Sequence, residues 1–158
     1  MRERDEPPSD TPDDPNESDG AHAPSMSDQG AEARATRRQR ILIVDDEPTY
    51  REYLDRFLTR IGLEVRTAES GTEAIKVSRE FAPDILLADW MLRCEMHGIE
   101  VGEALRGQWP DLRILLMTGF PTADLQKEAT RVGIDGFLEK PFSLDDLSSA
   151  IQDALALA

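Results

Sequence analysis

Residues 85–90 read ILLADW, an uninterrupted apolar run followed by a carboxylate at Asp89. A continuous run of this kind is typical of a strand in a parallel sheet, because helices cover both faces of such a sheet. Pro83 breaks the chain just before the run. We therefore predict a central strand over 85–88 that ends at Asp89.

Short apolar runs alternate with helical patterns on both sides of this strand, from Arg40 onward. That alternation is the signature of strand–helix repeats that build a parallel sheet. The sequence therefore predicts an α/β fold of five strands and five helices. The strands are predicted over 41–44, 63–67, 85–88, 114–117 and 136–139, and the helices over 48–61, 70–81, 98–106, 122–132 and from Ser143 onward.

Local signals mark the helix boundaries. Pro48 suits the first position of a helix, where its missing N–H costs no hydrogen bond. Ser70 followed by Glu73 is a capping-box pattern. Gly62 and Gly133 are expected to end the first and fourth helices.

The chain of 158 residues suits one domain and a tail. Residues 1–39 are rich in Pro, Asp and Ser and nearly lack large apolar side chains. Such a segment cannot bury enough surface to offset its ordering entropy, so we predict a disordered acidic tail before a domain over 40–158. We interpret a group of arginines at the junction as a solvated flank of the first strand: Arg34, Arg37, Arg38 and Arg40.

Composition also argues against several functions. The net charge of −14 disfavours binding to nucleic acid, which requires clustered Lys and Arg. No apolar run approaches the roughly 20 residues that cross a bilayer, and the N-terminus has no signal-peptide pattern. We expect a cytoplasmic protein that does not associate with a membrane. The lone Cys94 fits a reducing compartment.

Polar residues stand at the carboxyl ends of four predicted strands, which is the edge where open parallel sheets bind ligands. Three carboxylates brought together repel one another unless a cation lies among them, and Mg²⁺ prefers oxygen ligands and binds phosphate oxygens. A hydroxyl and an ammonium group at the same edge can contact a phosphoryl group. The pattern predicts a magnesium–phosphoryl site built from Asp45, Asp46, Asp89, Thr118 and Lys140.

Each of these residues has an ordinary structural explanation when taken alone. Asp45, Asp46 and Thr118 can cap helices, and Lys140 can extend into solvent. Their joint occurrence at four strand ends favours the functional interpretation.

Four segments together resemble the defining segments of the response-regulator receiver family: ILIVDDEP at 41–48, ILLADW at 85–90, LLMTG at 115–119 and GFLEKPF at 136–142. The resemblance covers residues 40–158. It implies a (βα)5 doubly wound parallel five-stranded sheet with the flavodoxin-like strand order 2-1-3-4-5. It also implies a cis peptide bond at Lys140–Pro141, which gives Pro141 a structural role.

The resemblance assigns the metal site and the phosphoacceptor. Asp89 matches the phosphoacceptor, and Asp45 and Asp46 match the acidic metal pair. The backbone carbonyl of Met91 matches the remaining protein ligand. The implied ion is Mg²⁺, with Mn²⁺ as an alternative.

The resemblance also assigns a conformational switch. Thr118 and Lys140 match the two residues that contact the phosphoryl group, and Thr118 and Phe137 match the switch pair. The readout face would comprise the helix over 122–132, the strand over 136–139 and the helix after Ser143. Phosphorylation-dependent homodimerisation through this face is a further expectation.

The implied function is that of a phosphoacceptor rather than an enzyme. The donor would be a sensor histidine kinase or a histidine phosphotransfer protein, and the output would be contact with an unknown protein target. Because the sequence ends soon after the last predicted helix, we expect a stand-alone receiver without an output domain.

Two alternatives are weighed against this function. A phosphohydrolase that uses an aspartyl phosphate would need an Asp-x-Asp motif, and Asp45-Asp46-Glu47 lacks that spacing. A receiver-like binding module that is never phosphorylated would be favoured by a missing acceptor, Thr or Lys, and all three are present.

The loop after Asp89 departs from the family pattern. Arg93 replaces the usual proline, and the loop is one residue longer. Met91 and Phe120 occupy positions that flank the phosphoryl group in the family. We expect these apolar side chains to slow hydrolysis of the acyl phosphate, or else to be incidental packing.

Overall fold

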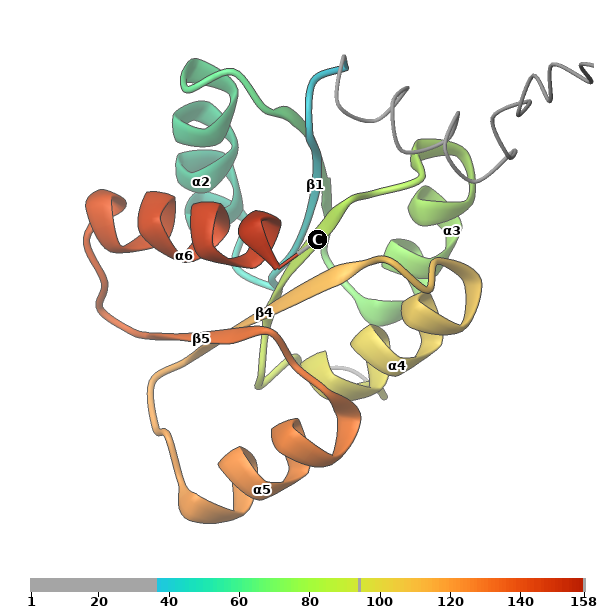
Figure 1. Cartoon of the computed structure of the whole chain (residues 1–158), viewed down its shortest axis with the longest axis vertical. Coiled ribbons are helices and arrows are strands. Elements are labelled where there is room, and N and C mark those ends of the chain that lie inside the picture. Colours follow the sequence, from blue (N-terminus) through green and yellow to red (C-terminus); the bar gives the residue numbers. More distant parts are fainter. Residues whose placement is uncertain (1–36, 94, 158) are drawn as a thin grey trace, which may run out of the picture.

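The computed structural model describes residues 37–93 and 95–157, which form a five-stranded parallel sheet with helices on both faces (Figure 1). The strand order is β2-β1-β3-β4-β5, so the predicted α/β class and the 2-1-3-4-5 order are confirmed. The strands are β1 Arg40–Val44, β2 Glu64–Ala68, β3 Ile85–Asp89, β4 Arg113–Thr118 and β5 Gly136–Glu139, and the helices are α2 Pro48–Arg60, α3 Gly71–Phe81, α4 Gly98–Gln108, α5 Ala123–Val132 and α6 Leu144–Ala156.

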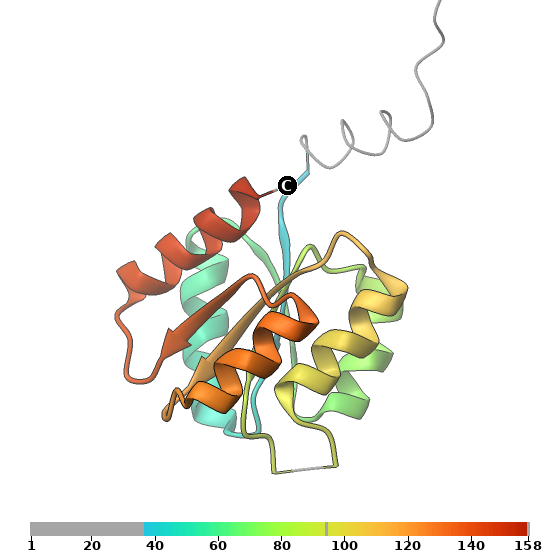
Figure 2. The ribbon, with the colours of Figure 1, turned by 60° about the horizontal axis from the view of Figure 1, so that its bottom comes forward.

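The helices divide unequally between the two faces of the sheet. α2 and α6 cover one face, and α3, α4 and α5 cover the other (Figures 1 and 2). Side chains of the central strands alternate between these layers, because successive residues of a strand point to opposite faces. In β1, Ile41 and Ile43 pack toward α2 and α6, whereas Leu42 and Val44 pack toward the other three helices.

The local signals mark the predicted boundaries closely. The Ser70 hydroxyl accepts a hydrogen bond from the Glu73 N–H at 3.2 Å. Gly62 and Gly133 have φ angles of 101° and 76°, which L side chains rarely adopt and glycine adopts freely. The second strand was predicted one residue too early, because the N–H of Leu63 donates to a carbonyl of α2 and still belongs to the helix end.

The amino ends of the strands are joined by ion pairs that the sequence did not reveal. The Arg37 guanidinium donates to both carboxylate oxygens of Asp84, at 2.8 and 2.9 Å. The same carboxylate accepts from the N–H of Arg40 at 2.9 Å. The interpretation of Arg37 and Arg40 as a solvated flank is therefore wrong.

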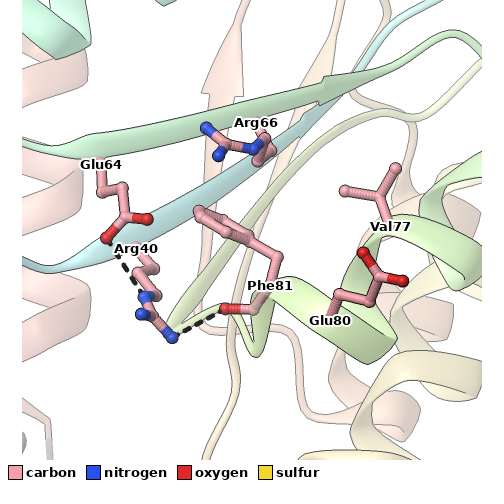
Figure 3. A pocket seen from close by; sticks show the side chains of 6 residues that line it. All are labelled: Arg40, Glu64, Arg66, Val77, Glu80 and Phe81. Carbon is pink, nitrogen blue, oxygen red and sulfur yellow. Dashed lines mark hydrogen bonds and ion pairs between the residues drawn. The ribbon is translucent and has the colours of Figure 1, made fainter.

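A cavity of about 380 Å³ lies at this amino-terminal end of the sheet (Figure 3). Arg40 pairs with Glu64 at 3.2 Å and donates to the backbone carbonyl of Phe81 at 3.0 Å. The guanidinium groups of Arg40 and Arg66 both lie over the Phe81 ring. These contacts join β1 and β2 to α3, and they lie away from the carboxyl ends of the strands. The lining residues are Arg40, Glu64, Arg66, Val77, Glu80 and Phe81.

Several predictions fall outside the described residues. These are the disordered state of the tail as far as residue 36, the interpretation of Arg34, and the interpretation of Cys94. The boundary between tail and domain therefore stays a prediction. Within 37–93 and 95–157, no helix has the length and apolarity needed to cross a membrane.

The close contact between α4 and β3 generates a prediction with a matched control. A Cβ at Gly98 would clash with the Asp89 carbonyl oxygen, whereas a Cβ at Gly107, in the same helix, would meet nothing within 4 Å. Gly98→Ala should lower the free energy of unfolding by about 1–3 kcal/mol through overpacking. Gly107→Ala should raise it by up to about 1 kcal/mol, because alanine favours the helix. Urea denaturation measures both, and equal effects would contradict the contact.

Candidate metal and phosphoryl site

Three carboxylates converge at the point where the strand order reverses. β1 pairs directly with β3, and Val44 lies opposite Ala88, so the residues that end these strands are neighbours. One ligand oxygen from each of Asp45, Asp46 and Asp89 lies within 4.8 Å of the others. The three acidic residues therefore lie together in the structure, as predicted.

The Asp45 carboxylate is only 1% exposed, yet both of its oxygens have partners. One oxygen accepts the N–H of Glu47 at 2.9 Å, and the other accepts from the Lys140 ammonium at 3.1 Å. A buried charge is tolerated when it is paired and hydrogen-bonded in this way. The pairing holds this carboxylate at the edge of the sheet.

Lys140 brings a cation to the site from the segment after β5. Its backbone N–H donates to the Thr118 carbonyl at 2.7 Å, which continues the pairing of β4 and β5 beyond β5. Its ammonium nitrogen lies 3.1 Å from Asp45 and 3.2 Å from Asp89. The peptide bond from Lys140 to Pro141 is cis, as the resemblance predicted.

Asp89 has an altered acidity. Burial raises the pKa of the Asp89 carboxyl above its ordinary value, and the charge of Lys140 lowers it by a smaller amount. Burial disfavours the ionised form because the charge loses hydration. The ionised carboxylate is therefore destabilised where it stands, and an added cation would stabilise it.

The loop after β3 supplies contacts to two of the carboxylates. The Met91 N–H donates to Asp89 at 3.1 Å. The backbone N–H and the guanidinium of Arg93 both lie 3.3 Å from Asp46. In the place of the family's proline, the chain thus presents a cation to the acidic site.

The predicted switch residues lie on neighbouring strands. Thr118 ends β4 and is 2% exposed, and its hydroxyl accepts from the N–H of Phe120 at 3.1 Å. Phe137 of β5 is 38% exposed, so its ring points at least partly into solvent. Met91 and Phe120 are 63% and 79% exposed, so neither side chain is buried in the core, and their effect on hydrolysis stays a prediction.

The first turn of α2 makes two contacts at the site that were not predicted from the sequence. The Tyr50 ring lies beneath the Lys140 ammonium, and Arg51 donates to the Asp45 carbonyl at 2.6 Å. Burial and, to a smaller extent, Asp45 raise the pKa of Tyr50 far above its ordinary value, so the phenol stays neutral. The available signal was position, because the first turn of α2 begins three residues after Asp45.

The donor set fits a hard divalent cation. Carboxylate oxygens are the ligands that Mg²⁺ prefers, and the ion usually keeps waters and binds phosphate oxygens as well. Asp45, Asp46 and Asp89 would hold the ion, with its charge offsetting their mutual repulsion.

The fold and the acidic site together define a class of protein, the signal receiver domain. The family model described as "Response regulator receiver domain" matches residues 41–152, and the chain belongs to this family of two-component signalling. The predicted family is therefore confirmed.

Individual relatives agree with this assignment. The chain is 36% identical over 116 residues to the response regulator MprA of Mycobacterium tuberculosis, a match that covers 73% of this chain and 50% of MprA. It is 35% identical over 118 residues to the regulatory protein AtoC of Escherichia coli, covering 75% and 25%. The chain thus spans about half or less of these proteins. A structure of Vibrio cholerae chemotaxis protein CheY4 aligns with a TM-score of 0.71 and 29% identity, covering 75% of this chain and 99% of that one.

The acidity of Asp89 generates a prediction about stability. A raised pKa means that the folded protein binds the proton more tightly than the unfolded chain, so ionisation of Asp89 costs stability as the pH rises through the folded pKa. Asp89→Asn should therefore raise the free energy of unfolding at pH 7, and Lys140 keeps Asp45 as its partner. The difference should disappear below the ordinary carboxyl pKa of 3.8.

With Mg²⁺ bound, the wild type should become more stable than Asp89→Asn, which reverses the order expected at pH 7 without the ion. At a free concentration of about 100 times its Kd, an ion that binds only the folded state adds about 2.7 kcal/mol. The wild type should gain this stabilisation and Asp89→Asn should gain less. Urea denaturation with and without Mg²⁺ measures the effect, and equal stabilisation of both proteins would remove Asp89 from the metal site.

Proposed function

We propose that the protein is a magnesium-dependent phosphoacceptor that takes a phosphoryl group onto Asp89 from a sensor histidine kinase or a histidine phosphotransfer protein. The observation that carries the proposal is the convergence of three carboxylates with the Lys140 ammonium at one edge of the sheet. Membership of the receiver family supports the same chemistry. In this role the chain is a substrate of phosphoryl transfer rather than an enzyme.

The proposed reaction is an in-line displacement at phosphorus. An oxygen of Asp89 forms the new P–O bond while the P–N bond to the donor imidazole breaks, and the imidazole nitrogen keeps the electron pair and takes up a proton. Mg²⁺, or Mn²⁺ in its place, when held by Asp45, Asp46, Asp89 and the Met91 carbonyl, would neutralise charge on the transferring oxygens. Lys140, whose ammonium lies 3.2 Å from Asp89, contributes a further positive charge.

The proposed response is a shift between two arrangements of the switch residues. The new charge on Asp89 attracts the Thr118 hydroxyl, which at present accepts from the Phe120 N–H. Its movement leaves space into which the partly exposed Phe137 ring can turn. The face formed by α5, β5 and α6 then changes shape, and partners that prefer one arrangement select it.

The remaining parts of the proposal concern partners and location. The output is contact with a protein target through the α5–β5–α6 face, and a phosphorylation-dependent homodimer would use the same face. The acidic charge of −14 supports a protein rather than nucleic acid as the partner. A cytoplasmic location belongs to this proposal.

Met91 and Phe120, both exposed beside the site, would slow access of water to the acyl phosphate.

Phosphorylation can be tested directly. The protein is incubated with acetyl phosphate and Mg²⁺, and its intact mass is measured. We expect one added phosphoryl group on the wild type, none without Mg²⁺, and none on Asp89→Asn. Asp84→Asn is the matched control, because Asp84 lies at the opposite end of β3 and should leave the adduct unchanged. An adduct that persists in Asp89→Asn would place the acceptor elsewhere. No adduct and no Mg²⁺ binding would favour an unphosphorylated binding module.

The switch can be tested separately from the transfer. Thr118→Ala should still accept a phosphoryl group, because Asp89 and Lys140 remain, but its Phe137 ring should stay exposed. With fluorinated phenylalanine, the ¹⁹F resonance of Phe137 should move on phosphorylation of the wild type and stay unchanged in Thr118→Ala. Phe137→Leu identifies the resonance, and Thr130→Ala, an exposed threonine of α5, is the control. A wild-type shift that survives in Thr118→Ala would separate Thr118 from the readout.

A further inference from the structure

The first turn of α2 places an aromatic ring against the cation of the site. The ammonium nitrogen of Lys140 lies over the Tyr50 ring, 4.5 Å from its centroid. A cation at this distance from the face of an aromatic ring is attracted by the negative potential of the π-system. The side chain of Lys140 thus contacts α2 as well as the two carboxylates.

The Tyr50 ring also contacts two other aromatic rings. Its centroid lies 6.3 Å from the ring of Phe142, in an edge-on orientation of 63°, and 6.3 Å from the ring of Tyr53, with an interplanar angle of 24°. Phe142 lies two residues after Lys140. The ring therefore bridges α2 and the segment that carries the lysine, which restricts movement of both.

The carboxylate partners of Lys140 would also take part in the reaction, whereas its aromatic partner would not. Asp45 and Asp89 bind the ammonium at 3.1 and 3.2 Å, but the same carboxylates are the groups that would turn toward a metal ion and a phosphoryl group. A lysine held by these groups alone would lose its partners when the site is loaded. The Tyr50 ring takes no part in metal binding, so it can hold Lys140 throughout.

We propose that Tyr50 is a positioning residue whose ring face holds the Lys140 ammonium beside Asp89. The contact itself is a property of the unmodified protein, and its effect on phosphoryl transfer rests on the proposed function. The phenol hydroxyl has no part in it. The face of the ring is what matters, so phenylalanine should replace tyrosine and leucine should not.

The contact can be measured without phosphorylation. The sequence contains three lysines, Lys76, Lys127 and Lys140, so spectra of protein labelled with ¹³C at lysine Cε are simple to assign. The ring current of Tyr50 should shift the Hε resonance of Lys140 upfield in the wild type, and Lys140→Arg identifies that resonance by its loss. The shift should persist in Tyr50→Phe and disappear in Tyr50→Leu.

Tyr53→Leu is the matched control. Tyr53 is on the same helix and stacks on Tyr50, but it is exposed and its ring is not the one beneath Lys140. It should keep the upfield shift. A thermal melt of each variant identifies any loss of folding, and Tyr50→Phe keeps the test decisive should Tyr50→Leu fail to fold. An unshifted Lys140 resonance in the wild type, or a shift retained in folded Tyr50→Leu, would overturn the proposal.

The consequence for transfer is a second readout. With acetyl phosphate and Mg²⁺, Tyr50→Leu should be phosphorylated roughly three- to tenfold more slowly than the wild type, which is the range that a partly desolvated cation–π contact supports. Tyr50→Phe should restore most of the rate. Wild-type rates in folded Tyr50→Leu would overturn the positioning role. Absence of phosphorylation in the wild type, with the upfield shift present, would instead contradict the proposed function and leave the contact established.

Discussion

The repulsion among three carboxylates at one edge of the sheet is the constraint on which the rest of the site depends. Asp45, Asp46 and Asp89 approach within 4.8 Å because β1 and β3 are neighbours, and burial makes their charges more costly. Lys140 offsets part of this cost from the residue after β5, and Arg93 offsets part of it from the loop after β3. Because the carboxylates still repel one another, the site favours binding of a cation, and its structure should change when its charge changes.

Most of the fold could be predicted from the sequence because its signals are local and periodic. The buried strands are continuous apolar runs, and Ser70, Gly62 and Gly133 mark helix boundaries through their own backbone chemistry. The strand order came from resemblance, since alternation alone does not determine it. The ion pair between Arg37 and Asp84 escaped prediction because its partners lie 47 residues apart, and a charge run near a strand is usually solvated.

Some residues of the candidate site could likewise be predicted from the sequence, and others could not. The acidic residues, Thr118 and Lys140 could be found because each ends or directly follows a strand, and parallel strands bring their carboxyl ends together. Tyr50 was harder to find, because at helical spacing an aromatic residue looks like an ordinary core position, and only its place in the first turn after Asp45 sets it apart. The contact of Arg93 with Asp46 depends on the path of a loop that departs from the family pattern, and no sequence periodicity determines that path.

The strands of the sheet are not held equally firmly, because β5 lies at its edge. β5 has four residues and a single strand neighbour, and only Leu138 among its side chains is buried. β3, by contrast, has two strand neighbours and four fully buried side chains. Strands with few buried contacts open at lower free energy than the core. β5 should therefore move more easily than β3. A small change at Thr118 and Lys140 would then shift β5, while β1 and β3, which position the acidic residues, stay in place.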